Sequence, residues 1–324
     1  MRFHIKKNDQ SLGPFEPEYL QEQIYRGELT HETPACVEGG SDWVPLDTLL
    51  RAVRPGLAPA GRALPPKLDL ARLRDATERT ALTWLYVASV PVWLLLLVYC
   101  IVGLGIPLLV IGLVWLLIVL GELWYAAHLK TNAVRVSAEQ LPDLHRVVAQ
   151  SCERLGMACP DVYVLQHNVW NAFATKIFKR RMVVLFSGAV DSILLKGDME
   201  QMAWLVGHEL GHHWAGHLDF PQKLARAGGW LIWVNLWHSR RRELTCDRVG
   251  LYCAGSLKAS QLALMNATVG AQLADKVNLA VAQQQWQEYR GEFFVKYRTI
   301  YATHPHLLAR LDHLTSAAGE LGIG

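Results

Sequence analysis

The sequence predicts an α+β fold, a small β-sheet packed against helices, preceded by a helical membrane hairpin and a small N-terminal α+β unit. Three observations predict it. Residues 138–156 have the apolar periodicity of a helix, with one face formed by Leu141, Leu144, Val148 and Cys152. Runs rich in β-branched and aromatic residues, typical of strands, follow at 161–166, 170–178 and 181–188. Before them lies a long stretch without any charged side chain.

The first unit, residues 1–50, has short apolar stretches, turn signals and one expected amphipathic helix at 17–27. Leu20 and Ile24 would face inward in this helix, and Gly27 would end it. The unit resembles a GYF-like domain of the variant common in bacterial membrane proteins, through this helix and the segments Gly13-Pro14-Phe15 and VEGGSDWVPL. The resemblance implies docking of a protein partner. A folded cap without a ligand remains an alternative, because the aromatic set is thin.

The uncharged stretch covers residues 80–121, a run of 42 residues. A single helix of that length would be about twice as long as the ~30 Å hydrocarbon core, so two spans reversing at GLGIP are expected. Gly103 and Gly105 permit the turn, and Pro107 suits the first turn of the second helix. We place the hairpin at 81–125, after a linker and basic juxtamembrane segment at 51–80. A buried hairpin in a soluble core is the alternative.

Flanking charge predicts the orientation of this hairpin. Positive side chains lie before the first span and after the second, and the turn has none, so both ends are expected in the cytoplasm. They are Arg62, Lys67, Arg72, Arg74, Arg79, Lys130 and Arg135. The first residues contain no apolar signal-peptide segment, and the six cysteines form no compact disulfide pattern. We expect an integral protein of the bacterial inner membrane with cytoplasmic N-terminal and catalytic domains. A net charge of +3 gives no indication of a nucleic-acid partner.

The segment HELGHHWAGH, residues 208–217, contains the candidate metal ligands and the candidate base. His208 and His212 are four residues apart on one helix face and can hold one zinc ion, with Glu209 beside the first ligand as the base that acts on water. His213 and His217 are also four residues apart, but no acid lies between them where water activation needs one. We expect structural or supporting roles for this second pair.

A catalytic zinc needs three protein ligands and an open position, and the third is expected in residues 239–255. Glu243 and Asp247 are four residues apart on a second expected helix. Glu243 would complete the ligand set, and Asp247 would hydrogen-bond the free ring nitrogen of a ligating histidine. For these two acids alone, a solvated helix face is the alternative.

HExxH followed by ExxxD resembles the HtpX/CAAX-prenyl-protease family of membrane zinc metallopeptidases, a gluzincin group. Segments 171–188 (NAFATKIFKRRMVVLFSG) and 301–311 (YATHPHLLARL) resemble further family motifs in the same order, so the resemblance covers about residues 130–315. It implies zinc bound by His208, His212 and Glu243, with Glu209 as general base.

The resemblance also implies roles in substrate binding and catalysis for residues outside HExxH and ExxxD. Asn171, Ala172 and Phe173 would form an edge strand to which an extended peptide adds. His304 would lie near the zinc and stabilise the oxyanion, with an ordinary loop histidine as the alternative.

One departure from the family concerns the interval between HExxH and ExxxD, where HtpX-type members carry further membrane spans. Its apolar part, residues 228–237, is half the length that a span requires. Trp230, Trp233 and Trp237 at helical spacing suggest a helix on the inner leaflet, and a lid over the active site is the alternative. The substrate delivery of HtpX is therefore not assumed.

We expect residues 130–324 to be a zinc metalloendopeptidase with one Zn²⁺ per chain, acting on polypeptides in quality control or processing. Glu209 would take a proton from the zinc-activated water that attacks the scissile carbonyl and return it to the leaving amine. CAAX processing is not expected, because one hairpin cannot enclose the large intramembrane chamber of multi-span relatives. A membrane adaptor or regulator with a zinc-binding but non-proteolytic domain, and a non-peptidase zinc hydrolase, remain alternatives.

Overall fold

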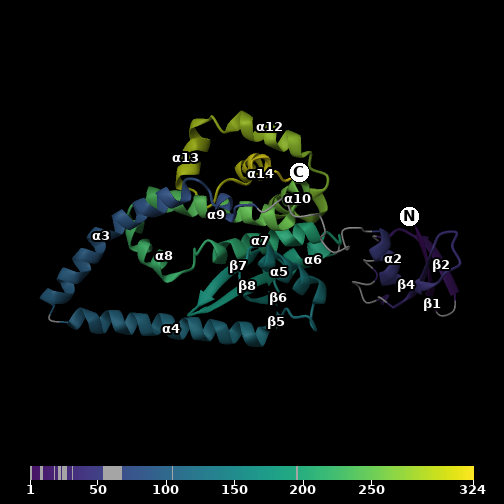
Figure 1. The fold of residues 1–324 in the computed structure, drawn as a ribbon, viewed down its shortest axis with the longest axis horizontal. Helices are drawn as coiled ribbons and strands as arrows, with labels where there is room; N and C mark the ends of the chain where they lie inside the picture. The colour runs from purple at the N-terminus through teal and green to yellow at the C-terminus, as the bar shows by residue number, and fades with distance from the viewer. Residues whose placement is uncertain are drawn as a thin grey trace.

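The protein is described by a computed structural model that covers residues 2–7, 10–17, 19–20, 23, 28–30, 32–53, 68–103, 105–194 and 196–324. Ile24 and Gly27 of the expected N-terminal helix lie outside these residues, as do positions 54–67 of the linker, with Arg62 and Lys67. The predicted α+β fold is confirmed, since the described chain contains two four-stranded sheets together with helices (Figure 1).

The N-terminal unit is built on a sheet in the order β2-β1-β3-β4, in which every neighbouring pair is antiparallel. The strands are β1 (Phe3–Lys7), β2 (Gln10–Phe15), β3 (Pro34–Val37) and β4 (Val44–Pro45), followed by helix α2 (Leu46–Val53). Phe3 and Ile5 alternate with polar residues along β1 and form a separate core with Leu20, Ala35 and Leu46. The unit therefore has a hydrophobic core of its own.

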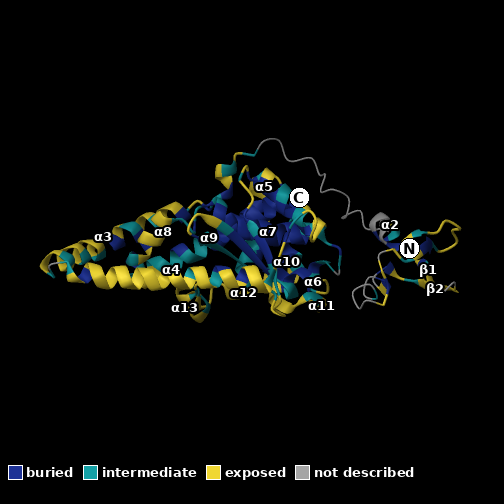
Figure 2. Ribbon diagram, turned by 90° about the horizontal axis from the view of Figure 1, so that it is seen from below, coloured by how far each residue is buried: buried dark blue, intermediate teal, exposed yellow. Residues whose placement is uncertain are grey.

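The uncharged stretch forms two helices, α3 (Glu78–Val102) and α4 (Ile106–Asn132), each long and apolar enough to cross a membrane, with mean hydropathy of 2.4 and 2.5. Both extend beyond the expected limits of 81–125. Gly105 has φ of 81°, which a turn can use and which favours glycine, and Pro107 lies in the first turn of α4. Apolar side chains cover most of α4 and remain exposed (Figure 2). Exposure of this kind is typical of a lipid-facing helix.

The sheet of the C-terminal domain has the order β5-β6-β8-β7, with β6 and β8 parallel and the outer pairs antiparallel. The strands are β5 (Ala133–Arg135), β6 (Asp161–Leu165), β7 (Ala172–Ile177) and β8 (Arg180–Phe186). Val183 and Leu185 of β8 face the main core, whereas Met182 and Val184 face the last turns of α4. One face of the sheet is thus covered by the domain's helices and the other by the end of the hairpin.

Helix α5 (Pro142–Arg154) begins four residues later than expected. Pro142 suits the first helical turn, and Leu141 precedes it with φ of 62°. The prediction that Leu141 shares the buried face of Leu144, Val148 and Cys152 is therefore wrong, since Leu141 is 37% exposed.

The tryptophan segment packs on the first hairpin helix. It forms the 3-10 helix η3 (Arg226–Trp230), preceded by α8 (Phe220–Ala225), and then begins the long helix α9 (Ile232–Ala254). The indole of Trp230 donates a hydrogen bond to the carbonyl of Ala88 in α3, 2.8 Å away, while Trp230 and Trp233 keep exposed faces. The cleft described below is lined by none of residues 228–237, which gives the lid alternative no support.

Gly228 of η3 lies directly against the backbone of α3. A Cβ added there would lie 2.2 Å from the carbonyl oxygen of Leu85, whereas one added at Gly229 would meet only the side chain of Asn235 at 3.8 Å. We expect Gly228→Ala to lower the free energy of unfolding by about 1–3 kcal/mol, because the two backbones must separate. Gly229→Ala is the matched control. Thermal unfolding in detergent measures both, and equal midpoints would contradict this packing.

Candidate metal centre and active site

The predicted metal ligands and the predicted base lie on two helices whose backbones are in close contact. Helix α7 (Met199–Trp214) contains His208, Glu209 and His212, and α9 contains Glu243 and Asp247. A Cβ on Gly207 would lie 2.6 Å from Cβ of Cys253, and one on Gly250 would lie 2.8 Å from the carbonyl oxygen of Trp204. Glycine at both positions lets the helices approach closely enough to bring the two motifs together.

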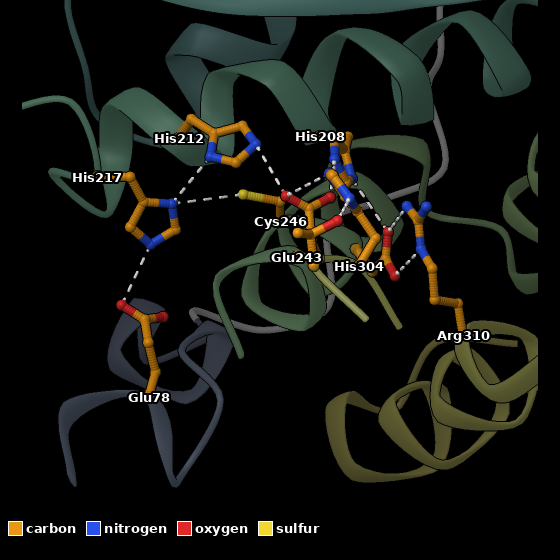
Figure 3. A network of polar contacts seen from close by, with 10 residues as sticks. Glu78, His208, His212, His217, Glu243, Cys246, His304 and Arg310 are labelled. Carbon is orange, nitrogen blue, oxygen red and sulfur yellow. Dashed lines mark hydrogen bonds and ion pairs between the residues drawn. The ribbon is translucent and has the colours of Figure 1, made fainter. Parts of the chain in front are cut away.

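The ring nitrogens of the two histidines converge on Glu243 (Figure 3). Nε2 of His208 lies 3.4 Å from one carboxylate oxygen of Glu243, and Nε2 of His212 lies 3.7 Å from the other. The structure thus places the predicted ligands His208, His212 and Glu243 around one point. Their role as ligands remains a prediction.

A second possible ligand set includes Cys246. Donor atoms of His208, His212 and Cys246 lie within 4.8 Å of one another, so geometry alone allows a set of two histidines and a thiolate. Burial, with the nearby charges of Glu243 and Glu209, raises the pKa of the Cys246 thiol well above its usual value, which disfavours the thiolate that a metal requires. The sulfur also lies 3.8 Å from Nδ1 of His217. His217 contacts Nδ1 of His212, the ring nitrogen that does not face Glu243. We therefore favour Glu243.

The donor set fits a divalent cation in charge as well as in position. Burial opposes ionisation of Glu243, but the hydrogen bond and charge of His208 hold its pKa below the usual range. Burial would lower the pKa of His208, yet hydrogen bonds to Asp247 and Glu243 raise it to about 10. The site therefore stabilises positive charge between these carboxylates. Two imidazoles and one carboxylate are ligands that zinc takes in catalytic sites.

Asp247 lies behind His208 and is fully buried. One of its oxygens is 3.0 Å from Nδ1 of His208, and Arg310 of α14 (Leu307–Leu321) donates two hydrogen bonds to the carboxylate, at 2.8 and 2.6 Å. Nδ1 of His208 would donate its proton to this carboxylate, and a metal would take the place of the second proton on Nε2. Sequence reasoning missed Arg310, although a buried acid requires a positive partner.

Removal of the Arg310 guanidinium would leave the buried Asp247 carboxylate without its cation. We expect Arg310→Met to lower the free energy of unfolding by about 3–5 kcal/mol. Arg135→Met is the control, because Arg135 also pairs with an aspartate at 2.6 Å, Asp161, but is 66% exposed; a loss of at most about 1 kcal/mol is expected there. Denaturant unfolding measures both, and losses of similar size would argue against the pairing.

Glu209 lies on the wall of a cleft of about 400 Å³. Burial raises the pKa of Glu209 to about 7, and a hydrogen bond from the backbone of Ala174 in β7 acts in the opposite direction. A carboxyl with a pKa near neutrality can both take up and release a proton in one reaction cycle. The cleft is lined by Trp170, Asn171, Ala172, Phe173, Ala174, Trp204, Leu205, His208, Glu209, His212, Leu218, Arg242, Glu243, Leu264, Ala267, His304 and Arg310.

The expected substrate strand and His304 both face this cleft. Strand β7 is at the edge of its sheet, and Asn171, Ala172 and Phe173 line the cleft at the start of the strand. His304 lies between α13 (Phe293–Tyr301) and α14, with Nε2 3.9 Å from Glu243 and 64% of its side chain exposed. Arg240 of α9 holds the end of α13 through hydrogen bonds to the carbonyls of Ile300 and Ala302.

His213 and His217 do not form a pair on one helix face. Helix α7 ends at Trp214, so His217 lies beyond it, after Gly216 with φ of 75°. Nε2 of His213 lies 3.0 Å from the carbonyl oxygen of Met182, and Nδ1 of His217 lies 3.0 Å from Nδ1 of His212. His217 also contacts Glu78, a buried acid that sequence reasoning did not select, although it closely precedes the uncharged stretch.

Comparisons with known proteins match two regions of the chain to family models. Residues 3–49 match the family model GYF domain 2, and residues 138–227 match Peptidase family M48. The second match includes His208, Glu209 and His212 and ends before Glu243. The family resemblance inferred for these two regions is therefore confirmed. No solved structure matches the chain.

The curated relatives that the chain matches include a metallopeptidase and several proteases by name. The plastoglobule-localized metallopeptidase 48 of Arabidopsis thaliana is 30% identical over 173 residues, 49% of this chain and 49% of that protein. The protease HtpX homologs of Pyrococcus furiosus and Thermococcus kodakarensis are 25% and 23% identical, over 62% of this chain and 80% of theirs. The alignment thus spans about half the length of the plant relative and most of the archaeal ones.

Proposed function

We propose, from the premise that the chain carries a peptidase family M48 domain behind a GYF domain, that it is a membrane-anchored zinc metalloendopeptidase. The observation that carries the proposal is the meeting of Glu209, two imidazole nitrogens and the Glu243 carboxylate in one open cleft, beside an edge strand. A structural zinc site closes all four positions with protein ligands and needs no base. Here Glu209 lines the cleft beside the expected ligands, where it would act as the base.

Zinc held by His208, His212 and Glu243 would supply an activated water and polarise the scissile carbonyl. Glu209 accepts the proton of the attacking water and then delivers it to the leaving nitrogen. Asp247 and Arg310 keep the ring of His208 in place through the hydrogen bonds described above.

An extended polypeptide would bind along β7, whose outer edge offers backbone N–H and C=O groups to an added strand. Asn171, Ala172 and Phe173 would contact the substrate next to the reacting bond. His304, whose Nε2 lies 3.9 Å from a carboxylate oxygen of Glu243, would hydrogen-bond the carbonyl oxygen of the substrate as it gains negative charge.

The membrane anchor is the hairpin α3–α4, which we place in a bacterial inner membrane with the GYF and peptidase domains in the cytoplasm. The basic residues on both sides of the hairpin and the uncharged turn support this orientation. The GYF unit would dock a protein partner, and the peptidase would act in protein quality control or processing.

Cleavage of an unfolded protein by the purified full chain in detergent tests the proposal, with and without a zinc chelator and after zinc is added back. We expect cleavage that the chelator abolishes and added zinc restores. Tight zinc binding without cleavage of any substrate would instead favour the adaptor alternative.

A further inference from the structure

A line of hydrogen bonds runs from His212 to the first residue of the membrane hairpin (Figure 3). Nδ1 of His212 lies 3.0 Å from Nδ1 of His217, and Nε2 of His217 lies 3.1 Å from a carboxylate oxygen of Glu78. Glu78 begins α3, so the line joins the HExxH helix to a distant part of the chain.

Only one placement of protons satisfies this line when His212 holds a metal. A neutral imidazole that gives Nε2 to a cation carries its proton on Nδ1, so His212 donates to Nδ1 of His217. His217 must then carry its own proton on Nε2 and donate it to Glu78. The other partners of Glu78, Arg74 and the hydroxyl of Thr245, are donors as well, so the carboxylate serves as the common acceptor.

Water has little access to this line. The side chains of Glu78 and His217 are both 0% exposed, so a lost partner could not easily be replaced by solvent. On the other side of the site, His208 has the same kind of support, since its Nδ1 meets the buried carboxylate of Asp247 directly. The two histidines of the motif are therefore each held by a buried carboxylate, one directly and one through His217.

We propose that His217 and Glu78 are positioning residues of the metal site: they fix the ring of His212 and couple the start of α3 to the metal. This inference rests on the proposed function in one respect, that a metal is bound at His212. His213 is the natural contrast, because it is buried on the same helix but bonds only to the carbonyl of Met182.

Zinc affinity measured by competition with a chromophoric chelator tests the inference on the full chain in detergent. We expect His217→Phe and Glu78→Gln each to weaken zinc binding by about tenfold or more, the range for lost hydrogen-bond partners of ligands. His213→Phe should change it by no more than about threefold. The double variant of His217 and Glu78 should lose little beyond the larger single effect, because both changes break one line.

The visible spectrum of the Co²⁺-loaded protein reports the geometry of the metal ligands, which a loss of folding stability alone does not change. We expect altered bands in His217→Phe and unchanged bands in His213→Phe. If His217→Phe does not fold, Glu78→Gln carries the test of both affinity and spectrum, because it keeps the shape of the side chain and removes only the charge of the common acceptor. Affinities and spectra equal to those of His213→Phe would overturn the inference.

Wild-type cleavage, measured on the same preparations, separates this inference from the proposed function. Zinc binding that depends on His217 and Glu78 without any cleavage would leave the inference standing and remove the peptidase assignment. If the wild type cleaves its substrate but the His217 and Glu78 variants bind zinc as tightly as the wild type, the peptidase assignment would stand and the inference would fail.

Discussion

The Glu209→Gln variant is expected to keep its zinc and to cleave peptide bonds at least about 10³-fold more slowly than the wild type. General acid–base groups contribute about 10²–10⁴-fold, and Glu209 would act in both the uptake and the release of a proton. Glutamine has nearly the same shape but cannot accept and return a proton. Because Glu209 is not one of the expected ligands, zinc content should stay close to that of the wild type.

The rate of cleavage under single-turnover conditions and zinc content by elemental analysis measure these two effects. Glu200→Gln is the control, since Glu200 lies in the first turn of the same helix and does not line the cleft. Full activity in Glu209→Gln would remove Glu209 from the reaction. Loss of zinc together with activity would instead mean that the carboxylate holds the metal, and the roles of Glu209 and Glu243 would have to be reassigned.

Much of the fold could be predicted because its signals are local. Runs rich in β-branched and aromatic residues identified β6, β7 and β8, and the run of uncharged residues identified the hairpin. The three-residue strand β5 was missed, because it directly continues α4 and is too short to show a period. The start of α5 was misplaced because the helical pattern extends through residues that Pro142 leaves outside the helix.

The candidate site was predictable where spacing along a helix fixes geometry. His208 with His212, and Glu243 with Asp247, are each four residues apart, so each pair shares a helix face whatever the rest of the chain does. Arg310 and Glu78 were not selected, because each reaches the site from an element distant in sequence. His217 was assigned a helical spacing, but α7 ends at Trp214 and Gly216 then turns the chain.

The tryptophan segment shows how local and distant information combine. Its spacing suggested a helix, and the structure joins the end of the segment to the helix that carries Glu243, since α9 runs without a break from Ile232 to Ala254. The proposed third ligand therefore lies on the same rigid element whose first turns pack near α3. Together with Glu78, this arrangement gives the hairpin two physical connections to the metal site, through α9 and through His217.

Zinc affinity distinguishes Glu243 from Cys246 as the third ligand. We expect Glu243→Gln to weaken zinc binding by more than the roughly 100-fold that loss of a ligand's hydrogen-bond partner can cost, because a first ligand and a negative charge are lost together. Cys246→Ala should weaken it no more than a few-fold, since burial keeps that thiol protonated. Zinc competition on both variants decides between the two ligand sets.

A larger loss of zinc affinity in Cys246→Ala than in Glu243→Gln would place a thiolate on the metal. It would also leave the Glu243 carboxylate facing two imidazoles as a second base candidate beside Glu209, so that the test of Glu209→Gln would have to be read together with a variant of Glu243.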